Sequence, residues 1–172
     1  MLNEILARQI AYVIEFEKKK ITEPVINLIN EQKQLAIIQE TELELQTKNR
    51  ELFSIYRSGA DIQDPAVNSR VVMLVSEIER YRFRISDWLT IGTKFYRGLS
   101  NYHQIQRDWP SSFEQTKLEY ELYQAKPHFK EEDSYNYKIC LANLMARASS
   151  AGESKWFTTT IEEMKNLSSN SF

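Results

Sequence analysis

Residues 25–56 read VINLINEQKQLAIIQETELELQTKNRELFSIY and contain neither glycine nor proline. Apolar side chains recur along this stretch at helical spacing, at Val25, Leu28, Ile29, Leu35, Ile38, Leu45, Leu52 and Tyr56. Such spacing lines one face of an α-helix. The middle of the stretch, residues 31–50, is rich in glutamine and glutamate. We therefore predict one long helix that is partly exposed or packs against a single neighbour.

Ile38, Leu45 and Leu52 recur every seven residues, a spacing that permits a short coiled-coil contact. Three such turns are too few to predict a coiled coil by themselves. We take these residues, with Trp109 and Trp156, as the candidate interface for a partner protein. For the two tryptophans, anchoring of the core or of a loop is the alternative.

The rest of the chain also reads as helices separated by short breaks. Leu2 to Phe16 shows an apolar helical face, and residues 58–65 (SGADIQDP) form the clearest loop. A central core helix is expected from Val67 through Arg82, Ile85, Trp88 and Leu89 to about Gln106, with a bend or break near Gly92 or Gly98. Further helices are predicted over residues 113–125 and 134–148, with a short last one from Phe157.

These segments predict an all-α fold, an elongated bundle of about five to six helices with one long, partly exposed helix. We expect a helical bundle domain over residues 1–150, followed by a short C-terminal helix and tail over residues 151–172. The low content of turn-forming residues, with 4 glycines and 4 prolines in 172 residues, favours long elements over hairpins.

The bulk composition excludes several classes of function. The formal net charge is -2, which gives no field that would hold nucleic acid non-specifically. The single cysteine, Cys140, cannot close an internal disulfide, so we expect a reducing intracellular compartment. No stretch is apolar enough to span a bilayer, and acidic residues interrupt residues 1–20. A membrane-spanning or exported protein is therefore not expected.

The sequence contains no motif of a known catalytic, cofactor-binding or metal site, so we predict no catalytic residue, no cofactor and no metal. The two histidines, His103 and His128, are not at ligand spacing with Cys140, which lies on an expected core helix as a buried thiol. No glycines are close enough for a phosphate-binding loop. The carboxylate pairs at 77/79, 131/132 and 162/163 lack the Glu-x-x-His motif of di-iron bundles and are expected on solvated helix faces.

The run Arg80-Tyr81-Arg82-Phe83-Arg84 interleaves cations with aromatic rings, as nucleic-acid-binding segments do. Consecutive residues of a helix point in all directions, so they cannot form one binding stripe. The favoured interpretation pairs Arg82 with a carboxylate at the edge of the core, with Arg80 and Arg84 exposed. Nucleic acid is then contacted only indirectly.

Residues 79–89, ERYRFRISDWL, resemble the central-helix signature of the GINS family, the four-subunit scaffold of the eukaryotic replicative helicase. The signature positions are filled by Glu79, Arg80, Arg82, Phe83, Ile85, Trp88 and Leu89. Residues 24–32 are similar to the family's earlier helix, and residues 112–123 could match the later one. After Leu89 this chain continues TIGTKF, where the family carries basic residues. The resemblance implies a nuclear, non-enzymatic subunit in DNA replication, whose signature residues serve a structural helix.

The broader expectation is a non-enzymatic helical scaffold or adaptor subunit of a larger assembly, with other protein subunits as its partners, in a homo- or hetero-oligomer. Its basis is the long helix, too polar to be wholly buried yet carrying apolar residues that a partner could cover. The alternative is a helical protein that binds membrane surfaces or membrane curvature, suggested by Lys18-Lys19-Lys20. The scattered basic residues disfavour it, because anionic lipids bind concentrated patches.

Overall fold

The computed structural model describes residues 7–10, 23–85 and 88–169, and all the regular structure in these ranges is helical. The chain divides into two compact units, Met1–Glu44 and Leu45–Phe172. The boundary between these units falls inside a helix. The all-α prediction is confirmed, with α2 to α8 and one 3₁₀ turn as the described elements.

The predicted long helix is confirmed as α2, Glu23–Ser58, which extends through both units. In the first unit its buried positions are Val25, Ile38 and Thr41, whereas Ile26, Ile37 and Leu43 are exposed. Residues 7–10 are helical as well. The rest of the helix expected over Leu2–Phe16 lies outside the described residues.

The second unit begins with the C-terminal turns of α2, from Leu45, and the loop after Ser58. This loop leads into α3, Pro65–Glu79, where Asp64 accepts a hydrogen bond from the Ala66 N–H at 2.7 Å and so caps the helix. Two ion pairs join α2 and α3, from Lys48 to Glu77 at 3.0 Å and from Arg70 to Glu51. The predicted loop is confirmed, because α2 ends at Ser58 and α3 begins at Pro65.

The single helix expected from Val67 to Gln106 is wrong. The chain leaves α3 at Arg80, makes a 3₁₀ turn at Arg82–Arg84 and starts α4, Leu89–Ile105, after an extended Trp88. The break does not fall at either glycine, since Gly92 and Gly98 both lie inside α4.

Tertiary packing explains the position of this break. A straight helix would hold residues 78 and 98 about 30 Å apart, at about 1.5 Å per residue. In the folded unit α3 packs on α4, and a β-carbon placed on Gly98 would come within 2.8 Å of the Ile78 Cδ1. The chain folds back so that the apolar faces of α3 and α4 cover each other.

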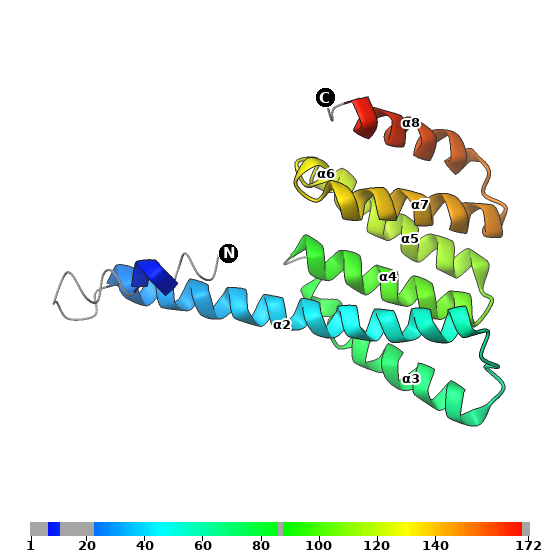
Figure 1. Ribbon diagram of the computed structural model, residues 1–172, viewed down its shortest axis with the longest axis horizontal. Helices are drawn as coiled ribbons and strands as arrows, with labels where there is room; N and C mark the ends of the chain where they lie inside the picture. The colour runs from blue at the N-terminus through cyan, green and yellow to red at the C-terminus, as the bar shows by residue number, and fades with distance from the viewer. Residues whose placement is uncertain (1–6, 11–22, 86–87, 170–172) are drawn as a thin grey trace. The chain divides into compact units, whose positions relative to one another are not determined.

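The remaining helices are α5, Trp109–Ala125, the short α6, Phe129–Glu132, α7, Ser134–Ala151, and α8, Lys155–Ser169. Figure 1 shows α4, α5, α7 and α8 in succession, each packed on the one before. The helix predicted over residues 113–125 is found as α5, but it starts earlier, at Trp109, because Asp108 caps it and accepts from the Ser111 N–H at 3.2 Å. The helix predicted over residues 134–148 is confirmed, and Gly152 ends it with a positive φ of 78°.

One buried apolar cluster of this unit lies between α5, α7 and α8, with α4 packed on α5. Its members include Leu89, Phe113, Tyr120, Tyr123, Tyr137, Cys140, Leu141, Leu144 and Ala148. Small side chains let α4 and α5 approach closely, and Ser100 Oγ lies 3.0 Å from Ser112 Oγ and 2.8 Å from Thr116 Oγ1. These buried hydroxyls satisfy one another, as buried polar groups must.

Candidate protein-interaction site

The loops that follow α2 and α4 lie at the same end of the second unit (Figure 1). Residues of both loops line a half-open hollow. The larger part, of about 440 Å³, is lined by Gly59–Gln63 and Ile105–Arg107. An adjoining part of about 220 Å³ is lined by Ile55, Tyr56, Gly59, Ala60, Gln104, Ile105, Arg107 and Trp109. The walls thus combine loop backbone, aromatic rings and one arginine.

Arg107 holds an unusual backbone conformation at this hollow. Its φ is 58°, and among the described residues it is the only one other than glycine with a positive φ. The N–H groups of Arg107 and Asp108 donate to the carbonyls of Gln104 and His103 at 3.0 and 2.9 Å, which closes α4 in a Schellman motif. Glycine normally occupies this position, because a β-carbon is strained there. The guanidinium is exposed and forms no ion pair with any described residue.

Several polar groups of the hollow lack a protein partner. Gln104 is 1% exposed, and its Oε1 accepts no hydrogen bond, while its Nε2 lies 3.4 Å from both the Ser100 carbonyl and Asn101 Oδ1. The backbone N–H groups of Ala60, Asp61 and Ile62 donate to no described residue either. Gly59 turns the chain into this loop with a positive φ of 65°.

An aromatic patch continues from the hollow along α2. The rings of Tyr56 and Phe53 lie 6.5 Å apart, and the Arg57 guanidinium stands 5.9 Å from the centroid of Phe53. Phe53 and Tyr56 are 45% and 36% exposed, which is high for large apolar side chains. We call Phe53, Tyr56, Arg57, Arg107 and Trp109 together the end surface.

The acidic groups nearest to the end surface already have local partners. Asp61 Oδ1 accepts from the Gln63 N–H at 2.9 Å, and Asp64 caps α3. Asp108 caps α5 and lies 3.4 Å from His103 Nδ1. Arg57 and Arg107, by contrast, pair with no carboxylate in the described part of the chain. The end surface therefore presents two arginines that no described carboxylate pairs with, although the charged carboxylates of Asp61 and Asp108 lie nearby.

Most of the residues expected at a partner interface pack within the chain itself. Leu45 and Leu52 have 0% exposure, and Ile38 is buried in the first unit. Trp156 packs its ring at 5.9 Å from Phe113 and contributes to the core. A regular heptad face is as suitable for intramolecular packing as for a partner, and here α2 uses it within the chain. Trp109 alone of the five lies at the hollow.

The segment that resembles the GINS signature forms the end of α3, the 3₁₀ turn and the start of α4. The expected carboxylate partner of Arg82 is confirmed, since its Nε and Nη2 donate to Glu79 at 2.7 and 2.6 Å. Arg82 is exposed, and its guanidinium stands 5.4 Å from the Phe95 ring centroid. Phe83 is 74% exposed and Arg80 is exposed as well, while Trp88 precedes α4 in an extended conformation and makes no capping hydrogen bond with its side chain. The continuous helix that the resemblance implies is not found here.

A buried ionic cluster lies apart from the end surface, between α4, α5 and α7. Arg97 donates from Nε to Glu119 Oε1 at 3.1 Å, and Glu119 is 1% exposed. Burial raises the pKa of the Glu119 carboxyl, against the opposing charge of Arg97. Burial also raises the pKa of the Cys140 thiol, so this cysteine is a buried neutral group, as predicted.

A second polar cluster holds α8 to α5 and α7. Glu163 accepts from the hydroxyls of Tyr137 at 2.6 Å and Tyr120 at 3.1 Å, with Gln124 at 3.3 Å and Lys130 at 3.5 Å. Burial raises the pKa of Tyr120 to about 12, helped by the charge of Glu163. The sequence-based placement of Glu163 on a solvated face is therefore wrong, because the tyrosines that reach it come from distant segments.

Glu131, Glu132 and Glu162 are exposed, as expected. Groups of histidine, cysteine or carboxylate that could hold a metal ion do not occur among the residues with described positions. Within the same residues, every helix is too short or too polar to cross a membrane.

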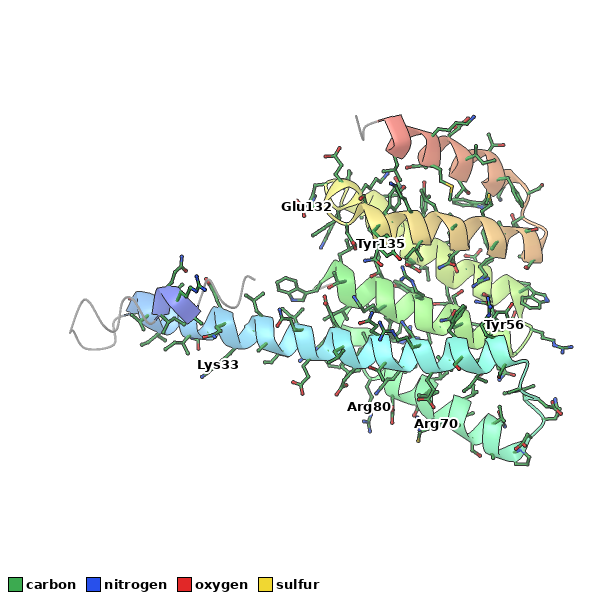
Figure 2. The ribbon with its side chains drawn as sticks, in the orientation of Figure 1. Lys33, Tyr56, Arg70, Arg80, Glu132 and Tyr135 are labelled. Atoms are coloured by element: carbon green, nitrogen blue, oxygen red, sulfur yellow. The ribbon has the colours of Figure 1, made fainter. Side chains whose placement is uncertain are left out.

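Figure 2 labels Tyr56 near the C-terminal end of α2, and Arg80 at the far end of α3 from the loop that precedes it. The sequence analysis did not identify Arg107 or Gln104 as site residues. The one available signal was for Arg107, because no glycine follows the helix end expected near Gln106. Comparison with models of protein families, with curated protein sequences and with solved structures gives no significant match.

Proposed function

We propose that this protein is a non-enzymatic helical scaffold or adaptor subunit that engages other proteins through the end surface. The observation that carries the proposal is the combination at one site of Phe53, Tyr56 and Trp109 with two unpaired arginines, beside a hollow. Aromatic residues and arginine are the types that supply most binding energy at protein interfaces.

The positions of the ionisable groups support a binding role over a catalytic one. Burial shifts the pKa values of Glu119 and Cys140 upward. A raised pKa suits a general acid, but a cysteine nucleophile needs a lowered one. Both side chains are buried in the core, and neither lines the hollow. A substrate in the hollow would meet Arg107, amide groups and the single carboxylate residue Asp61, without the nucleophile or second acid–base group that most hydrolytic and transfer mechanisms use.

The test is affinity purification at endogenous expression level, followed by mass spectrometry. We expect partners in a fixed ratio with the wild-type chain, and their loss with the double variant Tyr56→Ala/Trp109→Ala. Tyr135→Ala is the matched control, because Tyr135 is 74% exposed on α7. A chain that purifies as a monomer without partners would contradict the proposal.

A narrower form of the proposal is the helicase scaffold implied by the GINS resemblance. It predicts recovery of replicative-helicase subunits in the same purification. The signature segment does not form one helix, so the scaffold proposal does not depend on this form. Co-sedimentation with anionic liposomes tests the membrane-surface alternative, which predicts binding that the end-surface variant leaves unchanged.

A further inference from the structure

We infer that the end surface binds an acidic, extended segment of a partner polypeptide, with one carboxylate at Arg107 and one apolar side chain against Tyr56 and Trp109. The inference rests on the proposed function and specifies the chemistry of its partner.

The first step of the argument is charge. The whole chain has a formal net charge of -2, yet Arg57 and Arg107 stand at the end surface without a carboxylate partner among the described residues. An arginine guanidinium presents a planar fork of donors that matches a carboxylate in a two-point hydrogen bond. An acidic partner therefore supplies the charges that the chain itself does not.

The second step is the strained backbone of Arg107. A side chain other than glycine at a φ of 58° is disfavoured, and Gly59 and Gly152 fill the comparable positions elsewhere. The conformation directs Arg107 from a loop that also lines the hollow. A residue kept in a disfavoured conformation at a hollow points to a ligand for its side chain.

The third step is the set of unpartnered polar groups around Arg107. The Arg107 guanidinium presents donors that suit a carboxylate oxygen. Gln104 also lines the hollow, and its buried Oε1 accepts no hydrogen bond, so it needs a donor such as a peptide N–H. A polypeptide carries both groups within one residue, the acceptor on an acidic side chain and the donor on its backbone.

The fourth step is size and shape. Parts of about 440 and 220 Å³ admit side chains and a short length of main chain, but not a folded domain. Non-specific single-stranded nucleic acid instead needs a basic groove that follows its phosphates. Arg107 is the one basic residue among those that line the two parts of the hollow, so the hollow offers no such groove. A peptide that brings one carboxylate to Arg107 is the better fit.

The experiment measures fluorescence anisotropy of short labelled peptides with the full chain. The probe is a peptide of aspartate and glutamate around one phenylalanine. Its controls carry lysine in place of the acids or alanine in place of phenylalanine, and a single-stranded oligonucleotide of similar length is a further control. We expect binding of the acidic aromatic peptide alone, weakened by roughly tenfold or more in Arg107→Glu, a loss typical of an interface anchor.

Three variants make the result specific. Arg107→Gly removes the guanidinium and relieves the backbone, so lost binding in a chain of equal or higher stability cannot come from unfolding. Asp61→Asn keeps the acceptor for the Gln63 N–H but removes a negative charge, and should strengthen binding by about twofold or more. Arg80→Glu is the charge control, since Arg80 is exposed at the far end of α3, about 22 Å from its start.

Each of four results would overturn the inference. The wild-type chain would fail to bind the acidic peptide, would bind the lysine peptide equally well or would bind the oligonucleotide more tightly, or Arg80→Glu would weaken binding as much as Arg107→Glu does. If partners are still recovered from cells through Tyr56 and Trp109, the proposed function stands while the acidic-segment inference fails. If neither partner nor peptide binds, both fail.

Discussion

Arg107 shows how one residue can serve a site at a cost to the fold. Its backbone closes α4 in a conformation that glycine adopts freely, while its side chain stands at the hollow. A non-glycine residue in the left-handed region costs roughly 1 kcal/mol. The Schellman hydrogen bonds offset that strain and hold the residue in place.

Arg107→Gly should therefore raise the free energy of unfolding by about 0.5–1 kcal/mol. Urea denaturation followed by circular dichroism measures it. Gln106→Gly is the control, because Gln106 has a φ of -76°, where glycine only adds freedom to the unfolded chain, and this variant should be less stable than wild type. A destabilised Arg107→Gly would mean that the arginine side chain itself supports the fold.

Gly98 is the second residue whose role depends on its neighbours. An added β-carbon would meet the Asn49 side chain and come within 2.8 Å of the Ile78 Cδ1. Asn49 is fixed there by its own hydrogen bond to the Lys94 carbonyl at 2.7 Å. The glycine lets α4 pack tightly on α2 and α3.

Gly98→Ala should destabilise the chain by about 1–3 kcal/mol through overpacking, although alanine is the better helix former. Thermal unfolding of the single variants Gly98→Ala and Asn49→Ala, and of their combination, measures the effect. We expect the double variant to lose less than the sum of the two, because removal of Asn49 makes room for the methyl group. Additive losses would place the clash elsewhere.

At the scale of the elements, α8 is held by one apolar and one polar contact. Trp156 packs edge-on to Phe113 and Tyr120, at 5.9 and 5.8 Å between centroids. Glu163 accepts from Tyr137 and Tyr120, beside Lys130. Burial alone would raise the pKa of the Glu163 carboxyl, but these hydrogen bonds and the charge of Lys130 hold it below its usual value.

The docking of α8 should therefore weaken in acid. A carboxyl whose pKa is lowered by folding adds stability at pH values above its unfolded pKa, and this stability is lost as the pH falls through the folded pKa. Glu163→Gln should be less stable than wild type near neutral pH. Between about pH 6 and about pH 3, however, its stability should fall by less than that of wild type, because it has no carboxylate at this position to protonate. Melting temperatures across this range test it, with the exposed Glu162→Gln as matched control. Parallel pH profiles for wild type and Glu163→Gln would contradict it.

For the molecule as a whole, the Arg97–Glu119 pair joins α4 to α5 within the core of the second unit. The second carboxylate oxygen of Glu119, Oε2, has no hydrogen-bond partner, so Arg97 is the main group that compensates for the burial of this carboxylate. Removing one partner of a buried pair leaves an uncompensated charge, whereas replacing both with apolar groups is often tolerated.

Arg97→Met should therefore lower the free energy of unfolding. Removal of one partner from a fully buried pair costs about 3–5 kcal/mol, and we expect the lower end of this range because Arg97 is partly exposed. The double variant Arg97→Met/Glu119→Leu should recover much of this loss. Chemical denaturation of the single and double variants measures both values. If the double variant is as unstable as Arg97→Met, the charge of Glu119 is not the source of the loss.

Local sequence patterns were sufficient for the helices that have clear ends. The long α2, the loop before Pro65, and α7 with Gly152 at its end follow from periodicity, an Asp-Pro cap and a glycine stop. The candidate site was visible only in part. Trp109 was singled out as a tryptophan after a helix, whereas Arg107 and Gln104 lie in an ordinary polar segment.

The sequence by itself determined that this chain is helical, because helical periodicity and the scarcity of glycine and proline are local properties of the chain. Only the tertiary structure decided where α3 ends, which face of α2 is buried and which arginines stay unpaired. These outcomes depend on contacts between segments far apart in sequence, as Ile78 with Gly98, Arg97 with Glu119, and the loop at Gly59 with Arg107 illustrate. Periodicity indicates that a residue is apolar on one face, but it cannot indicate what will cover that face.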